Sequence, residues 1–207
     1  MGSEMCIRDR LYCGDKPMQK GILLSSMSLI KNVDEPLNIY ILTVDYREKG
    51  INYKPVDKAF AKYLKEKLNK SDIKVNIFLV DVTRYFVEEL PEANMQSRFT
   101  ACCMLRLFAD KTDIKDRVLY LDTDVLCRKD FRDFYYQNMD GIEIAGVSDY
   151  YGRWLFGDGY INSGVMLMNM RMIRQNGLLE KCREQCIRKE MFMPDPVSYT
   201  HLTLPTT

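Results

Sequence analysis

The chain has very little histidine, almost no net charge and no long apolar segment. Its single histidine, His201, stands close to the end of a sequence of 207 residues. Thirty basic and 29 acidic residues give a formal net charge of +1, which argues against a nucleic-acid-binding protein. No apolar run approaches the ~18 residues that a membrane-spanning helix needs, so we expect no transmembrane segment.

The cysteines also lack a recognisable metal-binding or disulfide pattern. Seven is an odd number, and no CxxC pair occurs in a chain too large to need disulfide staples. Cys182 and Cys186 lie one helical turn apart, but no second pair or nearby histidine would complete a zinc site. No secretory signal is recognisable near Met1. These features predict reduced cysteines in a cytoplasmic protein.

Apolar and charged residues are present in ordinary globular proportions, 46% and 29%. Their spacing predicts strands over residues 38–44, 74–80, 118–121, 142–147 and 164–170. It predicts helices over residues 20–31, 56–68, 94–108 and 178–189. The first helix would turn four apolar residues to one face, namely Ile22, Leu23, Met27 and Ile30.

Alternating strands and helices predict an α/β fold, with a mixed, mostly parallel sheet and helices on both faces. Ligands of such sheets bind beyond the carboxyl ends of the strands. Three acidic residues follow predicted strands at this edge, namely Asp15, Asp45 and Asp122.

The segment VLYLDTDVL, residues 118–126, is the most informative motif of the chain. Its apolar strand delivers Asp122 and Asp124, separated by Thr123, to the carboxyl edge of the sheet. Mn²⁺ and Mg²⁺ prefer oxygen ligands, and they commonly take one or two carboxylates together with phosphate oxygens. The alternative is that both aspartates are ordinary turn and cap residues, because short motifs recur by chance.

A second motif, GYINSGVMLMN, covers residues 159–169. Asn162, Ser163 and Gly164 predict a tight turn before an apolar strand, with side chains that can hydrogen-bond sugar hydroxyls. An ordinary strand-entry turn has the same composition. A nucleotidyltransferase or phosphatase-like enzyme would need a glycine-rich phosphate loop, which the sequence does not show.

Taken together and in this order, the motifs resemble those of family 8 glycosyltransferases. The matching segments are LYCGD, NIYILTVD, RLFAD, VLYLDTDVL and YINSGVMLMN, within residues 11–195. The resemblance implies a GT-A fold. It also implies retaining transfer of a hexose from UDP-glucose or UDP-galactose to a glycan or lipopolysaccharide-type acceptor, with Mn²⁺, or alternatively Mg²⁺, as cofactor.

The resemblance also implies roles for individual residues. Asp122 and Asp124 match the metal-binding pair, and Asp122 would also touch the ribose or the donor sugar. The other residues expected to bind the donor are Cys13, Asp15, Arg106, Thr123, Asn162 and Ser163. Asp149, Asn162 and Asp195 match positions that face the reacting sugars. Pro17 and Met18 stand where the family often has an Asn-Tyr pair.

The two ends of the chain resemble translated sequencing-adapter reads rather than parts of this domain. We therefore expect residues 1–10 and 196–207 to be foreign, and residues 11–195 to form a catalytic domain that is incomplete at its C-terminal end. His201 does not match the family's metal-binding histidine. The alternative function is accordingly an inactive nucleotide-sugar-binding fragment.

The expected partners are a nucleotide-sugar donor and a glycan or lipid-linked saccharide acceptor. A basic helix face, formed by Lys62, Lys65, Lys67 and Lys70, could touch an anionic membrane surface. A solvated face is the simpler interpretation of such a run.

Overall fold

The computed structural model describes residues 8–48, 50–89, 94–95, 101–156 and 160–189. Its main sheet has the order β5-β2-β1-β6-β8-β7. The strands are β1 (Arg8–Cys13), β2 (Leu37–Thr43), β5 (Val75–Asp81), β6 (Arg117–Leu121), β7 (Ile144–Ser148) and β8 (Ile161–Asn169). β5, β2, β1 and β6 are parallel, whereas β8 runs antiparallel to both β6 and β7. The predicted mixed, mostly parallel sheet is confirmed.

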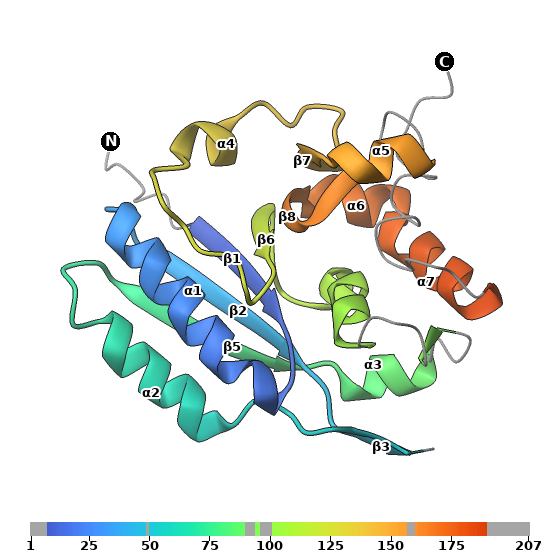
Figure 1. Ribbon diagram of the computed structural model, residues 1–207, viewed down its shortest axis with the longest axis horizontal. Coiled ribbons are helices and arrows are strands. Elements are labelled where there is room, and N and C mark those ends of the chain that lie inside the picture. The colour runs from blue at the N-terminus through green and yellow to red at the C-terminus, as the bar shows by residue number, and fades with distance from the viewer. Residues whose placement is uncertain (1–7, 49, 90–93, 96–100, 157–159, 190–207) are drawn as a thin grey trace.

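Helices cover both faces of this sheet. α1 (Gln19–Asn32) and α2 (Lys58–Leu68) lie side by side across β1, β2 and β5 in Figure 1. The 3₁₀ helix η3 (Ala101–Lys111), α6 (Met170–Asn176) and α7 (Leu178–Arg188) pack on the opposite face. Successive residues of a strand point to opposite faces, so Leu11 joins the core under η3 while Tyr12 joins the core under α1.

The remaining elements are short. They are the 3₁₀ turn η1 (Lys16–Met18), the hairpin of β3 (Tyr46–Glu48) and β4 (Ile51–Tyr53), α3 (Thr83–Glu88), α4 (Arg132–Tyr136) and α5 (Tyr150–Phe156). Gly177 adopts a left-handed conformation with φ of 65° between α6 and α7. Glycine adopts this conformation without strain, so one helix can end and the next can begin in a new direction.

Several sequence predictions need correction. Within the helix expected over residues 94–108, the structure describes the 3₁₀ helix η3 over Ala101–Lys111, and residues 96–100 lie outside the described residues. Asn162–Gly164 do not form a turn before the strand, because they already belong to β8. The pairing of Leu121 with Val165 and of Ser148 with Ile161 extends the ladder through these residues.

β1 also begins earlier than expected, at Arg8, where its N–H donates to the carbonyl of Pro36. The expected boundary between residues 10 and 11 therefore falls within a strand. Residues 1–7 and 196–207 lie outside the described residues, and the foreign origin of both ends stays a prediction. No helix among the described residues is both long and apolar enough to cross a membrane.

Candidate active site

A pocket of about 210 Å³ opens at the carboxyl ends of β1 and β6. Ligands of α/β sheets bind at this edge of the sheet. The pocket is lined by Cys13, Met18, Cys102, Cys103, Arg106, Tyr120, Asp122, Thr123 and Asp124. Five of these were predicted from the sequence as donor or metal ligands: Cys13, Arg106, Asp122, Thr123 and Asp124.

The loop that carries both aspartates is fixed by backbone contacts from two sides. The N–H of Asp122 donates to the carbonyl of Gly164 on β8 at 2.8 Å, and the N–H of Val125 donates to the carbonyl of Asp122 at 3.2 Å. On the other side, α1 approaches so closely that a Cβ on Gly21 would lie 2.5 Å from the carbonyl oxygen of Thr123. Glycine at position 21 therefore lets the helix support this loop.

Asp122 is held by two side chains inside the protein. Its Oδ1 accepts hydrogen bonds from Nη2 of Arg106 at 3.0 Å and from the hydroxyl of Tyr120 at 2.6 Å. Burial raises the pKa of Tyr120 well above its usual value, so the phenol stays protonated and donates. The carboxylate is thereby oriented before any ligand arrives.

Arg106 links three elements beneath the pocket. Its Nε donates to the carbonyl of Cys103 at 2.8 Å and its Nη1 to the carbonyl of Ser163 at 2.6 Å. The guanidinium carbon lies 4.0 Å from the ring centre of Tyr120, and the residue is only 2% exposed. A buried arginine held by these hydrogen bonds would supply fixed positive charge to an anionic ligand.

Asp124 contrasts with Asp122. Its side chain is exposed and has no hydrogen bond or ion pair within the described part of the chain. Among the described residues no cluster of three His, Cys, Asp or Glu side chains gathers around it. Two carboxylates still fit Mn²⁺ or Mg²⁺, because these ions complete their shells with water and phosphate oxygens. Asp124 and Asp122 are the residues that would hold such an ion.

Asp15 follows β1 after Gly14 and does not itself line the pocket. It is 6% exposed, and its Oδ1 has no hydrogen-bond partner among the described residues. Burial raises the pKa of this carboxyl above its usual value. Asp15 is also close enough to Cys102 for its negative charge to raise the pKa of that thiol, after the larger effect of burial. A buried carboxylate oxygen without a partner, near the pocket residue Cys102, would suit a hydroxyl donor of a ligand.

Comparison with known proteins agrees with this arrangement. The model of glycosyl transferase family 8 matches residues 11–196. The chain belongs to glycosyltransferase family 8. It is 24% identical over 170 residues to glycosyltransferase GlyA of Streptococcus pneumoniae, a match covering 77% of this chain and 20% of GlyA. It is 27% identical over 86 residues to a probable glycosyl transferase, Gly, of Streptococcus gordonii, covering 42% and 13%.

Solved structures show the same GT-A fold. An active-site mutant of LgtC superimposes with a TM-score of 0.75 at 19% identity, covering 94% of this chain and 70% of LgtC. The galactosyltransferase LgtC with donor and acceptor sugar analogues gives 0.74 at 18% identity, covering 93% and 69%. GlyE of Streptococcus pneumoniae gives 0.66 at 18% identity, covering 94% and 42%. The chain thus spans about a fifth or less of the curated relatives it matches.

The residues expected to face the sugars, Asp149 and Asn162, do not line this pocket. Asp149 follows β7, and its Oδ1 accepts from the N–H of Gly152 at 2.6 Å, which caps α5. Asn162 Oδ1 accepts from the N–H of Gly164 at 2.9 Å. Ser163 does not line the pocket either, but its carbonyl accepts a hydrogen bond from Arg106, which does. Asp195 lies outside the described residues, and its role stays a prediction.

Two other features complete the comparison with the sequence predictions. Asp45, expected at the same edge, is partnered by Arg47 at 2.8 Å and does not line the pocket. Tyr120 was missed as a site residue although strand alternation could have found it. It lies two residues before Asp122 and shares the η3-facing side of β6 with Val118.

Proposed function

We propose that this family 8 enzyme transfers glucose or galactose from a UDP-sugar to a glycan or lipid-linked saccharide, with retention of anomeric configuration and with Mn²⁺. The observation that carries the proposal is the difference in environment between two neighbouring carboxylates. Asp122 is fixed by Arg106 and Tyr120, whereas Asp124 faces solvent with its carboxylate available. A dication and a diphosphate together would satisfy both charges.

The chain's own residues would act mainly by holding the donor. Asp124 and one oxygen of Asp122 would bind the metal, and Arg106 would keep the carboxylate of Asp122 in place. Cys13 and Asp15, at the end of β1, would hold the uracil and ribose. When bound, Mn²⁺ supplies positive charge against the diphosphate as UDP departs. We assign no nucleophile.

The proposal places the enzyme in the cytoplasm, as the cysteine pattern predicts. Contact with an anionic membrane stays a prediction for the face defined by Lys62, Lys65, Lys67 and Lys70. All four side chains are exposed along and just beyond α2. Such a face would bring the enzyme near a lipid-linked acceptor.

Calorimetry with a panel of nucleotides, with Mn²⁺ and with chelator, tests the donor site. We expect UDP to bind best and to require the metal. Asp124→Asn should weaken metal-dependent UDP binding by about tenfold or more, equivalent to about 1.4 kcal/mol. Asp140→Asn serves as control, because Asp140 is exposed and lies outside this pocket. Equal affinity for every nucleotide regardless of metal would overturn the proposal.

The inactive-fragment alternative makes a different prediction for the same sample. Its support is that no third protein ligand stands beside Asp122 and Asp124 among the described residues. It predicts metal-dependent UDP binding without transfer or hydrolysis of any UDP-hexose. Chromatographic detection of released UDP, with sugar acceptors present, separates the two functions.

A further inference from the structure

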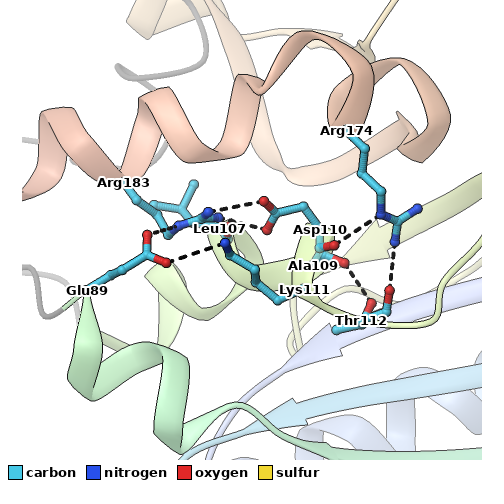
Figure 2. Close-up of polar contacts among 8 residues, drawn as sticks. All are labelled: Glu89, Leu107, Ala109, Asp110, Lys111, Thr112, Arg174 and Arg183. Atoms are coloured by element: carbon cyan, nitrogen blue, oxygen red, sulfur yellow. Dashed lines mark hydrogen bonds and ion pairs between the residues drawn. The ribbon is translucent and has the colours of Figure 1, made fainter.

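Another buried arginine, Arg183, lies away from the pocket, on α7. Arg183 is 2% exposed and forms hydrogen bonds to three different residues. Nη1 and Nη2 bind the two carboxylate oxygens of Asp110 at 2.7 and 3.1 Å, and Nε binds Glu89 at 2.5 Å. Nη1 also donates to the carbonyl of Leu107. Figure 2 shows this cluster, in which Lys111 adds a second cation at 3.6 Å from Glu89.

α6 contributes a second arginine, Arg174, which binds backbone carbonyls at the end of η3 and in the turn after it. Arg174 donates to the carbonyls of Asp110 and Thr112, at 3.1 and 2.8 Å, as drawn in Figure 2. It also donates to the carbonyls of Ile114 and Lys115, at 2.5 and 3.0 Å. Arg174 therefore ties the C-terminal end of η3 and the turn that follows it, while Arg183 reaches further back along the helix.

The contact between Arg183 and Leu107 lies next to the pocket residue Arg106 in η3. Leu107 immediately follows Arg106, the arginine that binds Asp122 at the pocket. Cys103 lines the pocket, and its carbonyl accepts from Arg106. The same short helix thus carries pocket residues at one end and residues bound by α7 at the other. Arg183 itself does not line the pocket.

We propose that Arg183 is a positioning residue, which locks η3 against α7 so that Arg106 meets Asp122 in the orientation that donor binding needs. The inference rests on the proposed function for its link to UDP. Its physical basis is that the planar guanidinium grips a carboxylate with two parallel bonds and a backbone carbonyl at the same time. A 3₁₀ helix has weaker internal hydrogen bonds than an α-helix, so external contacts decide its placement.

Two substitutions at one position test the inference. Arg183→Met removes the polar contacts of the side chain but keeps an apolar stem. Arg183→Lys keeps the positive charge but lacks the planar guanidinium that binds both oxygens of Asp110. Arg188→Met is the matched control, because Arg188 is 74% exposed on the same helix and its one ion pair among the described residues is with Glu184 at 3.4 Å. UDP affinity with Mn²⁺, the donor KM and kcat, and the unfolding temperature are measured for each.

We expect Arg183→Met to weaken UDP binding and to lower kcat/KM for the donor by about 10- to 100-fold, with an unchanged KM for the acceptor. Arg183→Lys should recover part of that loss, and Arg188→Met should behave like the parent. A lower unfolding temperature with unchanged UDP affinity and donor KM in the folded protein would overturn the inference, because it would show a purely structural role.

A measurement without nucleotide keeps the inference separate from the proposed function. The thiol of Cys103 is half-buried and lines the pocket, so its alkylation rate, followed by mass spectrometry, reports the placement of η3. We expect Arg183→Met to alter that rate severalfold and Arg188→Met to leave it unchanged. If the parent protein bound no UDP, the proposed function would fail and the alkylation rates alone would decide. An unchanged rate in Arg183→Met would then reject the inference.

Discussion

Individual carboxylates differ sharply in this protein, although their sequence contexts look alike. Asp122, Asp124 and Asp15 all follow apolar strands. The structure gives Asp122 two donors, exposes Asp124 to solvent, and buries Asp15 with one oxygen that finds no partner in the described part of the chain. The environment of Asp122 depends on Arg106 and Tyr120, of which only Arg106 was predicted. Motif spacing therefore identifies the residue types of the site, but it does not assign the state of each group.

Asp15 should make the protein less stable as pH rises from acid to neutral. Its pKa is raised in the folded state, so folding favours the protonated carboxyl. The resulting stability is present below the unfolded value near 3.8 and is lost as pH rises through the folded pKa. We therefore expect Asp15→Asn to raise the unfolding temperature at neutral pH and to weaken UDP binding.

The comparison of unfolding temperatures at pH 4 and pH 7 checks this prediction, because the advantage of Asp15→Asn should shrink in acid. Asp57 provides a control of opposite sign. Hydrogen bonds from Lys16 and then Gln19 lower its pKa, so its contribution is present above the unfolded value and is lost in acid. Asp57→Asn should therefore lower the unfolding temperature at neutral pH. An Asp15→Asn variant less stable than the parent at pH 7 would contradict the assignment.

Among the elements, α1 illustrates how tertiary contacts override an apolar stripe. The stripe predicted from sequence contained Ile22, Leu23, Met27 and Ile30. Ile22 is buried and Leu23 and Ile30 are partly buried against the same core, whereas Met27 is 47% exposed. The helix also buries three residues outside the predicted stripe, namely Ser25, Ser26 and Leu29. Ser25 is accepted in the core because its hydroxyl lies 2.8 Å from the hydroxyl of Tyr12, a partner that only the packed sheet supplies.

Replacement of Gly21 by alanine tests the contact between α1 and the aspartate loop. Helix propensity alone predicts that Gly21→Ala stabilises the protein by about 1 kcal/mol. The new Cβ would, however, lie 2.5 Å from the carbonyl oxygen of Thr123. We expect the clash to dominate, with a loss of about 1 to 3 kcal/mol of unfolding free energy and weaker UDP binding, because the loop of Asp122 and Asp124 must shift.

Urea denaturation and calorimetry provide the two measurements for this variant. Lys20→Ala is the matched control, because Lys20 is the exposed neighbour of Gly21 on the same helix and an alanine there meets no clash. Gly21→Ala with parental or higher stability and unchanged UDP affinity would show that the loop does not depend on the close approach.

At the scale of the whole molecule, the centre of the sheet contains an unusual buried charge. Arg10 is fully buried on β1, between β2 and β6, and its Nε and Nη2 have no hydrogen-bond partner among the described residues. Burial is the main cause that lowers its pKa to about 10. The rings of Phe131 and Tyr135 lie 4.8 and 4.6 Å from the guanidinium and compensate for part of the lost hydration.

We expect Arg10→Leu to stabilise the whole fold by about 1 to 4 kcal/mol, because an apolar side chain would remove the desolvation penalty. Urea unfolding curves measure the change. Arg47→Leu is the control, because that arginine is exposed and its replacement removes no buried charge. A decrease in unfolding free energy for Arg10→Leu would show that the contacts of the guanidinium outweigh the cost of burying it.

The sequence by itself determined the mixed α/β sheet, the positions of its main strands and the two aspartates at its edge. These follow from local periodicity and from the rule that parallel strands end together. Only the tertiary structure decided that Asn162–Gly164 belong to β8, that Arg106 lies beneath Asp122, and that α7 grips η3 through Arg183. Those contacts join residues far apart in the chain, so no local pattern specifies them. They form because packing of the core brings strand backbones and charged side chains from separate segments within hydrogen-bonding distance.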